Sequence, residues 1–137
     1  MKRITTIEIG GKEYPMKFSI EAMKAICEKY GSLENMVDVL GKSDYVDIVD
    51  AILWIEELLI RQGCAYKNEF EHDVPPETNS PIVDGKYVPL TAEQLALGID
   101  MADIAELKVK IFETMGLGRK NEISVKAKDD KKNDETT

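Results

Sequence analysis

The sequence is poor in the side chains that most catalytic and metal sites use. It has one histidine, His72, and two cysteines, Cys27 and Cys64, which lack Cys-x-x-Cys spacing. His72 precedes Pro75-Pro76 in a segment rich in turn residues, so nothing holds it beside a Ser or Cys nucleophile. A di-iron site built on Glu69 and His72 would need a second histidine. We therefore predict a non-enzymatic protein and interpret Cys27 as a buried free thiol, while acid–base chemistry by carboxylates alone stays open.

Long apolar runs are also missing. The most apolar segment, Ala51 to Ile60, contains Glu56-Glu57 and is too short to span a bilayer. The residues that follow Met1 lack the apolar core of a signal peptide. We expect a protein of the bacterial cytoplasm with no membrane partner.

Positive charge and phosphate-binding loops are scarce as well. The formal net charge of -8 argues against a general nucleic-acid binder, because phosphate contacts need clustered Lys and Arg. Gly10-Gly11 opens no helix and Gly116-Leu117-Gly118 ends one, so we predict no phosphate site and no cofactor. Asp44, Asp47 and Asp50 lack the central Gly and terminal Glu of an EF-hand loop. We interpret them as a solvated helix edge and predict no metal site.

What the sequence does contain is a well-defined opening unit. Residues 4–18 alternate as two strands do, with Tyr14, Met16 and Phe18 on one face, and Gly10-Gly11 supplies the two positive φ angles of a tight hairpin turn. Ser19 is then placed to cap a helix over 19–30. The predicted apolar positions of this helix are Ile20, Met23, Ile26, Cys27 and Tyr30.

Four further helices are predicted from caps and apolar spacing. One covers 32–40 and ends at Gly41, and the next covers 44–62, with residues 64–71 as a further extension past Gly63. The 44–62 helix is apolar around so much of its circumference that we place it at the centre of the core. A capping box, Thr91 with Gln94, opens a helix over 91–97. The last helix covers 101–115, with a predicted inner face of Met101, Ile104, Ala105, Lys108, Ile111, Phe112 and Met115.

These elements predict an α+β fold that is predominantly helical. An N-terminal β-hairpin packs on a small bundle of about four to five helices within one domain, residues 1–118. A second short hairpin is indicated by Asp84-Gly85 between two short apolar segments. Residues 119–137 are almost entirely charged and polar toward their end, and we predict a disordered tail there.

The opening segment resembles a known family. The stretch ITTIEIGGKEYPMKFSIEAMKAICEKYGSLENM, residues 4–36, is similar to the start of tail assembly chaperones from long-tailed (siphovirus-type) bacteriophages and prophages of Gram-positive bacteria. The similarity continues more loosely through AILWIEELLIRQG and LTAEQLALGIDMADIAELKVKIFETMG. Residues 64–88 carry no part of it.

The resemblance implies an interaction protein. Such chaperones bind the tape-measure protein, keep its apolar helices soluble and help recruit tail-tube subunits. They act in the cytoplasm of the bacterial host and are absent from the mature virion. The implied partners are therefore the tape-measure protein and the tail-tube protein, and a homo-oligomer stays open.

A chaperone of this kind needs apolar surface that remains outside its own core. Our candidate partner-binding face joins two helices and consists of Trp54, Leu58, Leu59, Ile104, Ile111 and Met115. Trp54 is also well suited to core packing, and that interpretation stays open. If the face is exposed, a polar substitution at Leu58 should abolish binding of the tape-measure protein and leave the fold intact.

Two alternative functions remain open at this point. The first is another phage structural or adaptor protein, such as a connector or a minor tail component. The second is an acidic inhibitor that mimics nucleic acid, which the net charge of -8 would allow.

Overall fold

The structure is a computed structural model that describes residues 4–42 and 44–117. Strands β1 (Ile4–Ile9) and β2 (Lys12–Lys17) form the first hairpin, and β3 (Ile82–Val83) and β4 (Lys86–Tyr87) form the second. The helices are α1 (Ile20–Tyr30), α2 (Leu33–Lys42), α3 (Tyr45–Phe70), α4 (Ala92–Gly98) and α5 (Ile104–Met115), with a 3-10 turn, η1 (Met101–Asp103), before α5. This is the predicted α+β, mostly helical fold. The predicted tail, residues 119–137, lies outside the described residues.

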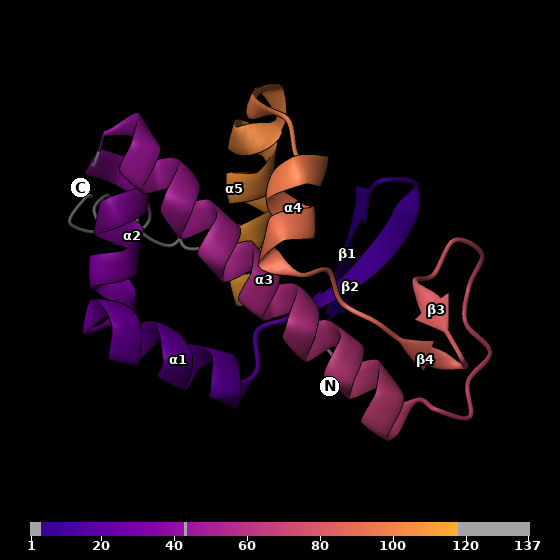
Figure 1. The fold of residues 1–137 in the computed structure, drawn as a ribbon. Coiled ribbons are helices and arrows are strands. Elements are labelled where there is room, and N and C mark those ends of the chain that lie inside the picture. The colour runs from indigo at the N-terminus through magenta and orange to yellow at the C-terminus, as the bar shows by residue number, and fades with distance from the viewer. Residues whose placement is uncertain (1–3, 43, 118–137) are drawn as a thin grey trace, which may run out of the picture.

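Helix α3 organises the other elements. It crosses the molecule diagonally, with α1 and α2 on one side and both hairpins on the other (Figure 1). It contacts α1, α2, α4, α5, β2 and β4, so the prediction of a central helix is confirmed. The side chain of Asp44 accepts a hydrogen bond from the amide of Asp47 at 3.1 Å, which caps its first turn as predicted.

The first hairpin closes through the predicted two-residue turn. Gly10 and Gly11 have φ angles of 61° and 83°, the positive pair that a type I′ turn requires. The turn sets the register, in which Ile9 lies opposite Lys12 and Thr6 lies opposite Pro15. Tyr14 and Met16 point into the core and are buried, as expected from the alternation.

Gly63 lies inside α3, not at its end. The helix predicted over 44–62 is too short by itself, and its predicted extension over 64–71 is confirmed, because α3 continues without a break to Phe70. A Cβ atom at position 63 would lie 2.7 Å from the amide nitrogen of Met16 and closer still to the carbonyl oxygen of Pro15. Gly63 is therefore the point where α3 meets the backbone of β2. In α2, similarly, Gly41 does not end the helix, which continues to Lys42.

The core uses partly different faces from the predicted ones. Along α1 the buried residues are Ala22 and Ile26, while Ile20 is 73% exposed and Met23 is also exposed. The stripe at 22 and 26 lies next to the predicted one and shares Ile26 with it, and the small Ala22 permits close packing. Ser19 caps the helix as predicted, accepting from the Ala22 amide at 3.0 Å.

Helix α5 is also rotated relative to the prediction. Leu107 and Thr114 are buried, whereas Met101 and Ala105 are exposed. Thr114 tolerates burial because its hydroxyl donates to the carbonyl of Lys110 at 2.8 Å and also hydrogen-bonds the Thr5 hydroxyl.

The two cysteines differ from the expectation. Cys27 is half-buried and Cys64 is the buried thiol. Burial raises the pKa of Cys64 to about 12, so this side chain stays a protonated thiol at neutral pH.

We predict that Gly63→Ala destabilises the domain. Alanine favours a helix by ~1 kcal/mol over glycine, but the added methyl group must push α3 away from β2. We expect a net loss of ~1–3 kcal/mol in the free energy of unfolding, measured in urea. Gly41→Ala is the matched control, because a Cβ atom there meets nothing within 4 Å. Equal stability of the two variants would contradict this account of Gly63.

Candidate functional site

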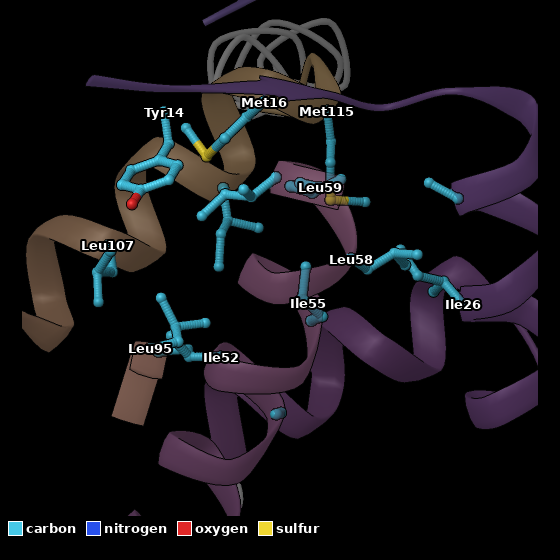
Figure 2. Close-up of a cluster of buried hydrophobic side chains, with 14 of the residues drawn as sticks. Tyr14, Met16, Ile26, Ile52, Ile55, Leu58, Leu59, Leu95, Leu107 and Met115 are labelled. Carbon is cyan, nitrogen blue, oxygen red and sulfur yellow. The ribbon is translucent and has the colours of Figure 1, made fainter. Parts of the chain in front are cut away.

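Five of the six residues predicted to form a partner-binding face belong to the core. Leu58 is 2% exposed and Ile104 is 5% exposed, and the other three are equally inaccessible: Leu59, Ile111 and Met115. Figure 2 shows Leu58 beside Ile26 of α1, and Leu59 close to Met115 of α5. The prediction that these side chains are exposed is wrong, because α3 is covered by α1 on one side and by α5 on another. A polar residue at Leu58 would be buried and would destabilise the fold rather than leave it intact.

Trp54 is the exception, and it leads to an open groove. Its side chain is half-buried and lies on the wall of a depression of about 540 Å³. We call this depression the Trp54 groove. Helices α1, α2, α3 and α4 all contribute to it, through Lys29, Tyr30, Val39, Asp47, Asp50, Ala51, Leu53, Trp54, Glu57 and Ala92.

An aromatic pair forms one wall of the groove. The rings of Tyr30 and Trp54 meet edge to face, with centroids 5.9 Å apart and an angle of 83° between planes. The ammonium group of Lys29 lies 5.0 Å from the centre of the Trp54 ring, within the range of a cation–π contact. This contact positions the cation at the edge of the apolar surface and restrains the indole ring.

Carboxylates line the rim of the groove. Asp47 and Asp50 are exposed and have no ion-pair partner among the described residues, whereas Glu57 pairs with Arg61 at 3.1 Å. Burial, and secondarily the charge of Asp50, raise the pKa of the Tyr30 hydroxyl above its ordinary value. Asp44, Asp47 and Asp50 are all exposed along α3, in agreement with their interpretation as a solvated edge. The groove therefore combines an apolar wall with a rim on which three carboxylates, Asp47, Asp50 and Glu57, outnumber the one cation in its described lining, Lys29.

Sequence reasoning identified Trp54 but missed the residues that face it. Tyr30, Val39 and Ala92 lie on three different helices and line one groove because α1, α2 and α4 pack around α3. The one local signal was Tyr30, the last apolar position of its helix. Nothing in the spacing of α2 or α4 marked Val39 or Ala92.

A second unusual feature is the carboxyl group of Glu56 in the core. Glu56 is fully buried on α3, and neither of its oxygens has a hydrogen-bond partner within residues 4–42 and 44–117. Burial raises its pKa to about 8, while the positive charge of Lys110 acts in the opposite direction. At neutral pH the group is therefore mostly protonated, which reduces the cost of its burial.

The other polar residues considered in the sequence are not brought together. His72 follows α3 in an exposed segment. Over the described ranges, no three His, Cys, Asp or Glu side chains are grouped closely enough to hold a metal ion. The helices of the described part are each too short or too polar to cross a membrane.

We predict that Glu56 makes the fold less stable as the pH rises from about 4.5 to about 8. In this window the folded protein retains the Glu56 proton and the unfolded chain has lost it, so a rise in pH favours unfolding. The slope cannot exceed ~1.4 kcal/mol per pH unit from one group. The stabilisation that the protonated Glu56 gives to the folded state is complete below pH 4.5 and is lost as the pH passes through 8.

The test compares the wild type with Glu56→Gln, which has no titrating proton at this position. Urea unfolding at several pH values between 5 and 8 gives the difference in unfolding free energy between the two proteins. We expect this difference to change steadily with pH in favour of the variant. A difference that is constant over the range would show that Glu56 is ionised in the fold.

Comparison of the chain with protein-family models, with curated proteins and with solved structures finds no match in any of the three.

Proposed function

We propose that this protein is a tail assembly chaperone of a long-tailed bacteriophage or prophage. In this role it binds the tape-measure protein, keeps it soluble and helps recruit tail-tube subunits in the cytoplasm of the host. The observation that carries the proposal is the resemblance of residues 4–36 to the start of such chaperones. Those residues form the first hairpin, the capped helix α1 and the beginning of α2.

The Trp54 groove supports the proposal by supplying a place for a client helix. A helix of the tape-measure protein would rest apolar side chains against Leu53, Trp54 and Val39, where these are only half-buried by the chaperone itself. Full burial of one large apolar side chain contributes ~1.5–3 kcal/mol. A groove of about 540 Å³ holds only a few such side chains, and part of their burial energy offsets the entropy lost on association. Each chaperone therefore binds its client weakly. Weak, repeated contacts suit a chaperone that must be removed when the tail assembles.

The charge of the protein supports the same role. A formal net charge of -8 keeps neighbouring chaperones apart when several bind along one long client. The carboxylates of Asp47 and Asp50 at the groove also discourage a second copy of this acidic protein from entering it.

We predict that Ala92→Arg weakens the protection of the tape-measure protein. Ala92 is exposed at the start of α4 and lines the groove, so a long side chain there obstructs the groove without removing a core contact. The measurement is the soluble fraction of a tape-measure protein co-expressed with the full chain. We expect this fraction to fall at least ~3-fold relative to the unmodified chaperone.

Ala96→Arg is the matched control, because Ala96 is exposed on the same helix and does not line the groove. Equal loss with both variants would contradict the groove as the binding surface. If the unmodified chain leaves the tape-measure protein insoluble, the proposed function itself fails. Recovery of the protein as a component of purified virions would instead favour a connector or minor tail protein.

A further inference from the structure

The outer edge of β1 is a second surface of the protein that presents backbone hydrogen-bonding groups together with charged side chains. In a two-residue hairpin the residues beside the turn form a hydrogen-bonded pair, and the pairs then alternate along the strands. Because Ile9 pairs with Lys12, the pairs Thr6 with Pro15 and Glu8 with Glu13 are the non-hydrogen-bonded ones. The backbone amides and carbonyls of these four residues therefore point away from the hairpin.

The outer edge of β2 is already covered. The amide of Glu13 donates to the carbonyl of Asn79 at 2.8 Å, and Asn79 adopts a positive φ of 73° in the loop before the second hairpin. Pro15 has no amide hydrogen to satisfy, and its carbonyl lies against Gly63 of α3. The side chain of Asn68 fixes the second hairpin by bonding both the amide and the carbonyl of Tyr87, at 2.8 and 3.0 Å.

The outer edge of β1 has no such cover. Within the described part of the chain, the backbone groups of Thr6 and Glu8 that point outward have no hydrogen-bond partner. This edge lines a cleft of about 350 Å³, which we call the β1 cleft. Its residues are Thr6, Ile7, Glu8, Ile9, Glu13, Gly98, Ile99, Asp103, Glu106, Leu107 and Lys110.

The shape of the β1 cleft fits an extended chain. The hydroxyls of Thr5 and Thr114 hydrogen-bond where α5 contacts β1, and neither residue lines the cleft. Four consecutive residues of β1, from Thr6 to Ile9, line the cleft and span ~13 Å. Ile7 and Ile99 are half-buried and supply apolar surface beside the open backbone groups, whereas Ile9 and Leu107 in the same lining belong to the buried core.

The charges of the cleft define its occupant. Glu8, Glu13, Asp103 and Glu106 line it, and none of the four has an ion-pair partner among the described residues. Glu8 and Glu13 lie directly opposite each other in the register, an arrangement in which like charges are destabilising. The described lining has one cation, Lys110, beside these four carboxylates. The charge of Lys110 also acts to lower the pKa of the buried Glu56, so it is shared between two sites.

We propose that the β1 cleft binds an extended segment of another polypeptide, which adds as a strand to the edge of β1 and carries Lys or Arg at alternate positions. The backbone of the segment pairs with Thr6 and Glu8, and its basic side chains neutralise the facing pair Glu8 and Glu13 together with Asp103 and Glu106. Its apolar residues lie on the half-buried Ile7 and Ile99. The proposal does not depend on the Trp54 groove or on its client.

The test uses the full chain and blocked eight-residue peptides of alternating Lys and Val, with an alternating Glu and Val peptide as the charge control. We expect the Lys peptide to slow hydrogen exchange at the amides of Thr6 and Glu8 by ~10-fold or more, and the Glu peptide to have no effect. A Lys peptide that is N-methylated on the pairing edge should not bind. Slowing at other amides only, or equal binding of both charge forms, would overturn the proposal.

Glu8→Lys separates binding from stability. It places a cation opposite Glu13, so the hairpin should be at least as stable as before, while affinity for the Lys peptide should fall ~10-fold. Glu93→Lys, an exposed change on α4 outside the cleft, is the control and should leave the affinity unchanged. Unaltered affinity in Glu8→Lys would contradict the proposed contacts.

Two other occupants of the edge would be recognised in the same measurements. If the Thr6 and Glu8 amides are already protected in dilute full-length protein without peptide, the edge is taken by another segment of this chain. If their protection rises with protein concentration, the occupant is a second copy. Either result would overturn the assignment to a basic partner.

Discussion

The contact between the backbone of Pro15 and the bare Cα of Gly63 determines how the rest of the domain is arranged. No side chain fits between β2 and α3 at this point, so the strand lies directly on the helix. Pro15 suits the position because it faces Thr6 in a non-hydrogen-bonded pair and needs no partner for an amide. With the hairpin held there, Tyr14 and Met16 point into the core. The outer edge of β1, on the far side of the hairpin from this contact, stays without a backbone partner among the described residues.

The same contact explains why α3 is long and why the side chains in its middle are buried. A helix that ended at Gln62 could not support the hairpin on its Gly63 face or extend to the Asn68 side chain that fixes Tyr87. Because α3 is covered by strands, by α5 and by α1, the apolar residues in its middle, from Ala51 to Ile60, are mostly core. Near its middle the surface of α3 is open around Trp54, where α1, α2 and α4 form the other walls of the groove, and at its ends Val46 and Phe70 are exposed. Because the sequence of this central helix is not wholly apolar, one charged residue type, Glu56, is buried with the apolar ones.

Local features of the fold could be predicted from the sequence, and features that depend on packing could not. The turn at Gly10-Gly11 and the caps Ser19, Asp44 and Thr91 are decided by neighbours within four residues, so their chemistry is visible in the sequence. Gly63 was ambiguous, because a glycine that weakens a helix and a glycine required for close approach look the same without the partner strand.

The candidate site shows the same division. Leu58 and Trp54 are both apolar residues of α3, and the sequence alone does not say which of them α1 will cover. The structure covers Leu58 with Ile26 and leaves Trp54 half-exposed against Tyr30. The edge of β1 was more accessible to prediction, since the register follows from the turn. Whether α5 closed over that edge or stood away from it was a question of tertiary structure.

Helix α4 connects the two open surfaces. It has only seven residues, and Leu95 is its one buried side chain, so a single apolar anchor holds it against the core. Ala92 at its start lines the Trp54 groove, and Gly98 at its end lines the β1 cleft. A Cβ atom on Gly98 would lie 3.0 Å from the side chain of Ile9, so the end of α4 fits closely against the hairpin. A shift of this short helix would therefore change the width of the groove and the cleft together, and the two surfaces are not structurally independent.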